Sequence, residues 1–135
     1  MKQSHHLRDW TFVLTGLLAV ALVIWLTLSF CNSICRGFER FDAIWSTHDA
    51  STTYYIENGK TWPEKWDDLY PILTQRDFDS DRIARIQDIV DFNFQVDPSD
   101  NLTEFEAISM RDGTRNGELH IANQRIRDIL IESRD

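Results

Sequence analysis

The chain has 135 residues, room for one small domain, and its 14 Lys and Arg against 22 Asp and Glu give a formal net charge of −8. The charge is unevenly placed: no charged residue occurs between Trp10 and Cys35, whereas the chain from Arg36 onward carries 12 basic and 21 acidic residues. A domain with that acidic excess repels phosphate backbones, so we expect no nucleic-acid partner.

The uncharged stretch near the N-terminus predicts a transmembrane helix over residues 10–31. A hydrocarbon core of about 30 Å needs roughly 20 helical residues, and this stretch supplies them. The alternative is a cleaved signal peptide, whose apolar run is normally about 7–15 residues long and is followed by small residues. Because this run is longer and ends at the bulky Phe30, we predict a retained anchor with the lipid bilayer as a partner.

The residues that flank the span predict its orientation. Lys2 and Arg8 make the short N-terminal tail basic, which favours the cytoplasm, although Arg36 and Arg40 make the count across the span nearly even. We therefore predict three segments: a cytoplasmic tail at 1–9, the transmembrane helix at 10–31 and an acidic extracytoplasmic α+β domain at 32–135.

Small residues and two cysteines in and beside the span permit helix contacts, although a plain lipid-facing anchor is the favoured interpretation. Thr15, Gly16 and Ala19 permit the close approach of a second helix. Cys31 and Cys35 are four residues apart, on one helix face, where they do not normally bridge each other. They face lipid or a neighbouring helix, or form a bridge between two chains.

The helix is predicted to continue beyond the membrane to about residue 58. Apolar or uncharged side chains recur mostly three and four residues apart, which predicts one helical stripe. Its members are Ile34, Phe38, Phe41, Ile44 or Trp45, His48, Thr52, Tyr55 and Ile56. Asn58-Gly59 then gives a strong stop signal, because both residues tolerate the left-handed backbone found at helix C-termini.

Short helices and a small sheet are expected after this helix. Pro63 suits the first turn of a helix over 63–70, and a further helical turn is expected at 81–86, capped by Ser80 or Asp81.

Strict alternation of apolar and polar residues predicts a strand at 90–96, and weaker patterns predict strands at 104–111 and 118–122. Asn123 is expected to cap a C-terminal helix. The predicted fold class is α+β: a long N-terminal transmembrane helix that continues into a domain with short helices and an antiparallel sheet of about three strands.

The segment Tyr55-Ile-Glu-Asn-Gly-Lys-Thr-Trp-Pro63, at the end of a long helix and before a sheet, resembles the type IV pilin and type II secretion pseudopilin superfamily. The resemblance implies a pilin-like fold and assembly through the N-terminal helix. The chain lacks the family's cleavage motif, because the only Gly near the span is Gly16 and Ala21 stands where prepilins carry a Glu.

No constellation of residues in the sequence predicts an enzyme, a metal site or a cofactor. His48 has Asp49 beside it, but adjacent helical residues face different ways, so we expect a structural histidine. Acidic residues between Asp77 and Asp88 have the spacing of a calcium loop, yet Arg82 replaces the glycine that such a loop needs. Helix capping is the simpler interpretation.

Aromatic residues gather between residues 45 and 66, mostly as expected core contacts. Trp62 and Trp66 flank Pro63 and are the two expected to be exposed for recognition. We predict a pseudopilin-like structural or interaction protein of the cell envelope, with other membrane or envelope proteins, or further copies of itself, as partners. The alternative is an anchored extracytoplasmic ligand-binding module or accessory subunit of a larger membrane complex.

Overall fold

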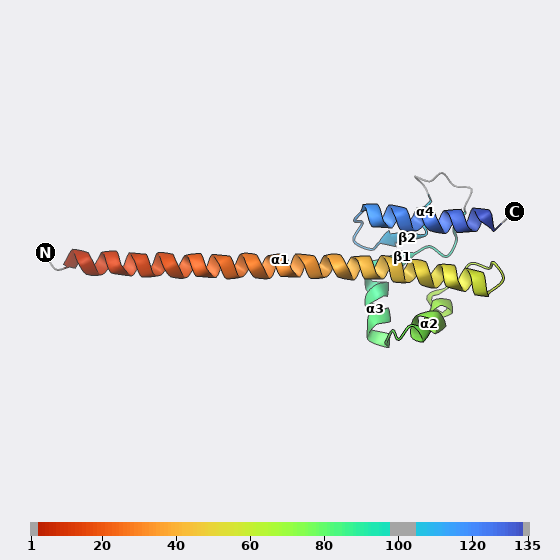
Figure 1. Ribbon diagram of the computed structural model, residues 1–135, viewed down its shortest axis with the longest axis horizontal. Coiled ribbons are helices and arrows are strands. Elements are labelled where there is room, and N and C mark those ends of the chain that lie inside the picture. The colour runs from red at the N-terminus through yellow and green to blue at the C-terminus, as the bar shows by residue number, and fades with distance from the viewer. Residues whose placement is uncertain (1–2, 98–104, 134–135) are drawn as a thin grey trace. The chain divides into compact units, whose positions relative to one another are not determined.

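A computed structural model describes residues 3–97 and 105–133 as a mostly helical α+β chain (Figure 1). Its elements are α1 (Gln3–Glu57), α2 (Trp66–Gln75), α3 (Ser80–Ile89), β1 (Val90–Phe92), β2 (Ile108–Met110) and α4 (Gly117–Glu132). The chain divides into two compact units, Met1–Phe38 and Glu39–Asp135. The predicted long N-terminal helix is confirmed, and α1 begins seven residues before the uncharged stretch.

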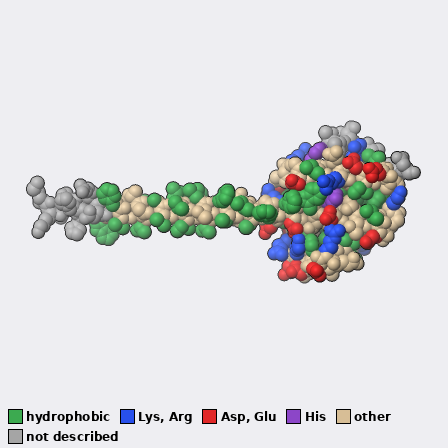
Figure 2. Space-filling model, viewed as in Figure 1, with side chains coloured by type: hydrophobic (Ala, Val, Ile, Leu, Met, Phe, Trp, Pro, Cys, Tyr) green, Lys and Arg blue, Asp and Glu red, His purple; other side chains and the backbone are tan. Residues whose placement is uncertain are grey.

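The first unit carries the uncharged part of α1. From Trp10 to Phe38 the residues are exposed, and hydrophobic side chains, green in Figure 2, lie along this part of α1. Within the described residues, α1 is the one helix that is long and apolar enough to cross a membrane. These properties fit a membrane anchor and also fit a signal sequence near the N-terminus.

The end of α1 follows the predicted stop signal. Gly59 has a φ of 66°, in the left-handed region where glycine costs least. The amide N–H of Asn58 donates to the Tyr54 carbonyl and that of Lys60 donates to the Tyr55 carbonyl, so the last carbonyls of the helix are satisfied. The prediction of a stop at Asn58-Gly59 is confirmed.

The second unit is built around the last turns of α1. Figure 1 shows α2 and α3 on one side of this part of α1 and α4 on the opposite side. In this part of α1 the buried residues occupy more of the helix circumference than one stripe, because other elements cover the helix on two sides. These buried residues are Ala43, Ile44, Thr47, Ala50, Ser51 and Tyr55. They pack in one core with the buried side chains of the other elements, among them Leu69, Leu73, Ile83, Ile86, Val90, Ile108, Leu119 and Ile126.

The sheet of the described residues has two short antiparallel strands, so the expectation of about three strands is wrong. Val90 pairs with Met110 and Phe92 pairs with Ile108. The Asn93 amide N–H still donates to the Ala107 carbonyl at 2.8 Å, and the Asn93 side chain then accepts the Gln95 amide N–H in a local turn where the pairing ends. Of the expected second strand at 104–111, only Glu104 lies outside the described residues, and the structure shows a strand at Ile108–Met110.

The expected third strand at 118–122 is the first part of α4. Leu119, Ala122, Ile126 and Leu130 are buried at spacings of three and four, which is a helical face. Asn116 caps the helix, since its Oδ1 accepts the Leu119 amide N–H at 2.8 Å. Asn123 is therefore not a cap: it is buried inside α4 and contacts the sheet.

The two short helices begin where capping side chains are available. α2 starts at Trp66, three residues after Pro63, where the Asp68 carboxylate accepts the amide N–H groups of Glu64 and Lys65. α3 is capped by Asp79, whose Oδ1 accepts the Arg82 amide N–H at 2.7 Å. Helix capping is therefore the role found for one of the acidic residues between Asp77 and Asp88. The cap is Asp79, whereas Ser80 or Asp81 was expected.

Candidate functional site

The three small residues predicted to allow helix contact lie on the exposed N-terminal unit. Thr15, Gly16 and Ala19 are all exposed, and the Thr15 hydroxyl donates to the Thr11 carbonyl at 2.7 Å. A Cβ placed at Gly16 would meet nothing within 4 Å. Another helix could therefore approach α1 closely here, and the Thr15 hydroxyl already has a hydrogen-bond partner. The role of these residues in contacts stays a prediction.

The last turns of the first unit expose large apolar side chains next to two thiols. Phe38 is 70 % exposed and Ile34 is 43 % exposed. Cys31 and Cys35 are free and exposed. An exposed apolar group outside a membrane is unfavourable in water, so these residues are candidates for contact with a partner.

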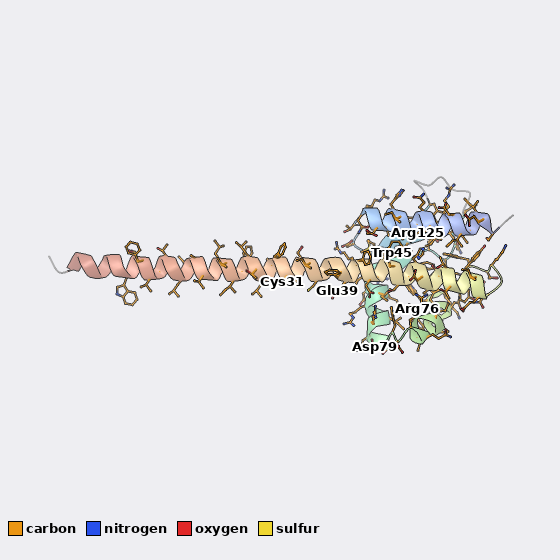
Figure 3. All side chains as sticks on the ribbon, viewed as in Figure 1. Cys31, Glu39, Trp45, Arg76, Asp79 and Arg125 are labelled. Atoms are coloured by element: carbon orange, nitrogen blue, oxygen red, sulfur yellow. The ribbon has the colours of Figure 1, made fainter. Side chains whose placement is uncertain are left out.

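In the second unit, Phe41 is 49 % exposed and its ring centroid lies 6.1 Å from that of Trp45. Trp45 itself is half-buried and joins α1 to α4 (Figure 3). Its Nε1–H donates to Glu118 at 3.1 Å, and the Arg125 guanidinium lies 5.1 Å from the ring centroid. Trp45 is thus a packing residue of the domain with one polar and one cationic partner.

Trp62 and Trp66 are half-buried within a cluster of aromatic rings, so the expected exposure is only partial. Trp62 stacks on Phe92 with ring centroids 5.4 Å apart, and its Nε1–H donates to the Asn93 carbonyl at 3.2 Å. Trp66 lies edge-on to Phe94 at 6.3 Å. These rings hold the residues around β1 against the loop after α1.

His48 and Asp49 do interact, contrary to the expectation from their adjacent positions. His48 Nδ1 lies 2.9 Å from Asp49 Oδ1, and the other Asp49 oxygen accepts from Arg76 at 3.2 Å. Arg76, just after α2, also donates to the Thr53 hydroxyl, so a network connects α2 with α1. The buried His48 Nε2 has no hydrogen-bond partner within the described residues.

A groove of about 420 Å³ lies between the start of the domain's part of α1 and α3. It is lined by Glu39, Asp42, Arg82, Arg85, Ile86, Asp88 and Ile89. Arg82 is held in place, since its guanidinium donates twice to Asp42, at 2.7 and 3.2 Å, and lies 3.6 Å from the Phe78 ring centroid. No pattern in the sequence predicts this groove, because Asp42 and Arg82 are forty residues apart along the chain.

The titratable groups form pairs rather than a reactive cluster. Arg40 pairs with Asp112, and the Asp112 carboxylate also accepts the Thr114 amide N–H at 2.9 Å. Hydrogen bonds from Thr114, together with the Arg40 charge, hold the pKa of Asp112 below its ordinary value of 3.8. Over residues 3–97 and 105–133, three or more His, Cys, Asp or Glu side chains nowhere gather closely enough to hold a metal ion.

Comparison with known proteins places the chain in no family: no family model, no curated protein and no solved structure matches it.

Proposed function

We propose that the chain is a single-pass membrane protein of the cell envelope that acts as a pseudopilin-like structural or interaction subunit. The observation that carries this proposal is α1: its first unit is exposed, apolar and uncharged from Trp10 to Cys35, and the same helix ends as the core of a folded domain. A helix with both properties serves as an anchor and as a support for the domain.

The orientation proposed is a cytoplasmic tail at residues 1–9 and an extracytoplasmic domain after the span. The basic short tail supports this orientation. The acidic domain also supports it, because a domain with 21 acidic residues is repelled by the anionic lipids of the cytoplasmic leaflet. Assembly through the N-terminal helix rests on the exposed apolar and slender surface of that helix and on the resemblance to pilins.

A ligand-binding or accessory function is the second candidate, and the groove between α1 and α3 favours it. Its volume is within the range of small-molecule sites, and Arg82 is fixed on one of its walls. No enzymatic activity is proposed, because Arg82 and Asp42 of the groove form an ion pair with each other rather than converging on a reacting atom.

The experiment that tests the proposal is fractionation of the full chain from cells, followed by its intact mass. We expect the chain to stay in membranes washed with alkaline carbonate, and protease added outside the cytoplasmic membrane to digest the domain. Recovery of a shortened chain in the soluble fraction would identify residues 10–31 as a cleaved signal sequence and overturn the proposal. Loss of residues 1–16 with retention in the membrane would indicate pilin-type processing after Gly16.

A further inference from the structure

Three charged side chains line the groove between α1 and α3 without being paired to another described residue. Glu39, Arg85 and Asp88 are exposed, and none of them forms an ion pair or a side-chain hydrogen bond with any residue in 3–97 or 105–133. The remaining charges of the groove neutralise each other, because the Arg82 guanidinium donates to the Asp42 carboxylate at 2.7 Å. The groove therefore offers one free positive and two free negative charges to a ligand.

Two isoleucines give the groove an apolar wall beside these charges. Ile86 is 2 % exposed and belongs to the core of the domain, and Ile89 is half-buried and packs against that core. An apolar wall with a few charged groups at its border is the usual construction of a site for a small amphiphilic ligand.

The spacing along α3 brings the free charges and the apolar wall together. Arg85 and Asp88 are three residues apart and Ile89 follows Arg85 by four, so these side chains are neighbours on the helix surface. Glu39 lines the same groove from α1. A ligand in the groove thus meets a guanidinium, two carboxylates and alkyl groups at once.

These charges match a zwitterion that has an anionic group and a primary ammonium group. A guanidinium donates two parallel N–H groups to the oxygens of a phosphate. A primary ammonium brings three N–H donors for the two carboxylates, as a lysine side chain does, whereas a quaternary ammonium brings none. A phosphoethanolamine group carries both the phosphate and the primary ammonium.

The place of Glu39 in the chain favours a lipid as the source of this group. Glu39, labelled in Figure 3, follows Cys35, the last residue of the uncharged stretch, by four residues. Four residues span at most about 14 Å in any conformation. In a chain anchored by that stretch, Glu39 therefore lies close to the lipid headgroups, whose region is roughly 5–8 Å deep.

We propose that the groove binds the headgroup of an ethanolamine phospholipid, with the phosphate on Arg85, the ammonium on Glu39 and Asp88, and the glycerol and first acyl carbons against Ile89. This inference rests on the proposed membrane anchoring and names the ligand of the second candidate function. An anionic lipid without an ammonium group is disfavoured, because it leaves both carboxylates unpaired beside its phosphate.

The test is lipid retention by the full chain, measured by native mass spectrometry. The chain is released from nanodiscs that contain equal amounts of phosphatidylethanolamine, phosphatidylcholine and phosphatidylglycerol with the same acyl chains. We expect about tenfold more phosphatidylethanolamine than either other lipid on the chain, since one charge-assisted hydrogen bond accounts for a factor of about ten. Equal retention of the three lipids overturns the proposal.

Variants of the groove show whether the retained lipid lies there. Arg85→Gln and Asp88→Asn each remove one free charge from an exposed position, so we expect the chain to fold and the preference for phosphatidylethanolamine to disappear. Arg85→Lys keeps the positive charge and should keep most of the preference. Asp128→Asn, on an exposed residue of α4 outside the groove, is the matched control and should change nothing. A full preference in both Arg85→Gln and Asp88→Asn would place the lipid elsewhere and overturn the assignment.

Soluble competitors separate a lipid from a free zwitterion. Millimolar phosphoethanolamine or leucine should leave the retained phosphatidylethanolamine in place, because the bilayer holds the lipid at a high effective concentration next to the groove. Displacement by either compound would assign the groove to a soluble zwitterion and overturn the lipid as its ligand.

Failure of this inference is distinct from failure of the proposed function. An absent lipid preference in a chain that remains in carbonate-washed membranes overturns the groove assignment alone. A chain that is washed out of the membranes overturns the anchoring and this inference with it.

Discussion

Asn123 forms hydrogen bonds with backbone groups at the edge of β2, as the backbone of a third strand would. Its Oδ1 accepts the amide N–H groups of Ala107 and Ile108, at 2.9 and 2.8 Å, and its Nδ2 donates to the Ile108 carbonyl at 2.8 Å. Ala107 and Ile108 are fully buried, so these backbone groups have no access to water. One amide side chain of α4 thus satisfies the polar groups at the outer edge of β2.

We expect Asn123→Leu to destabilise the domain strongly. The substitution leaves two buried N–H groups and one buried carbonyl without a partner, which costs about 3 kcal/mol in the free energy of unfolding. Near-ultraviolet circular dichroism of the detergent-solubilised chain during heating measures the loss as a lower Tm. Gln124→Leu, an exposed change on the same helix, is the control and should leave Tm unchanged within a degree or two.

Asp112 is expected to make the stability of the domain depend on acid pH. Its pKa is lower in the folded chain than in the unfolded one, because Thr114 and Arg40 stabilise the carboxylate. Such a group contributes stability at pH values above 3.8, and the contribution disappears as the pH falls through the lower folded pKa. Asp112→Asn should therefore lower Tm at neutral pH and show a smaller further loss between about pH 5 and pH 2. An unchanged pH profile in thermal melts of the variant would contradict this assignment.

At the level of elements, the packing of α4 on α1 depends on Trp45. Its ring joins His48, Glu118 and Arg125, which come from both helices. No local sequence pattern predicts this contact, because Trp45 is more than seventy residues from its partners on α4. The sequence near 118–122 was ambiguous for a similar reason: a short apolar alternation fits a strand or the first turn of a helix, and the buried Ile126 and Leu130 decide for the helix.

We predict that Trp45→Ala weakens the contact between α1 and α4. The half-buried indole supplies apolar contact, a hydrogen bond and a cation–π interaction, and its loss should cost about 2–3 kcal/mol. Trp45→Phe keeps a ring over Arg125 but loses the Nε1–H donor, for a cost of about 1 kcal/mol. Urea unfolding of the full chain in detergent, followed by near-ultraviolet circular dichroism, ranks the two variants. Equal losses would mean that the hydrogen bond, and not the ring, carries the contact.

At the level of the whole molecule, the sequence predicts those features that depend on residues close together along the chain. The uncharged helix, its continuation and its end at Asn58-Gly59 follow from runs and spacings within a few turns. The Asn123 contacts, the Asp49–Arg76 network and the groove at Arg82 join residues that are far apart along the chain, so no periodicity points to them. The structure shows which of the predicted interaction residues are exposed and which are packed, and their role in contacts stays a prediction.

Because α1 forms the centre of the domain core, its packing sets the order in which the protein matures. The buried turns of α1 are synthesised early, yet α4, which covers one side of them, comes more than sixty residues later: Tyr55 meets Ser133 only when both are in place. During translation the core face of α1 is exposed to solvent or to a chaperone until α4 has been made. Ribosome stalling before α4 would leave an unfinished product that quality-control proteases recognise by its exposed apolar face.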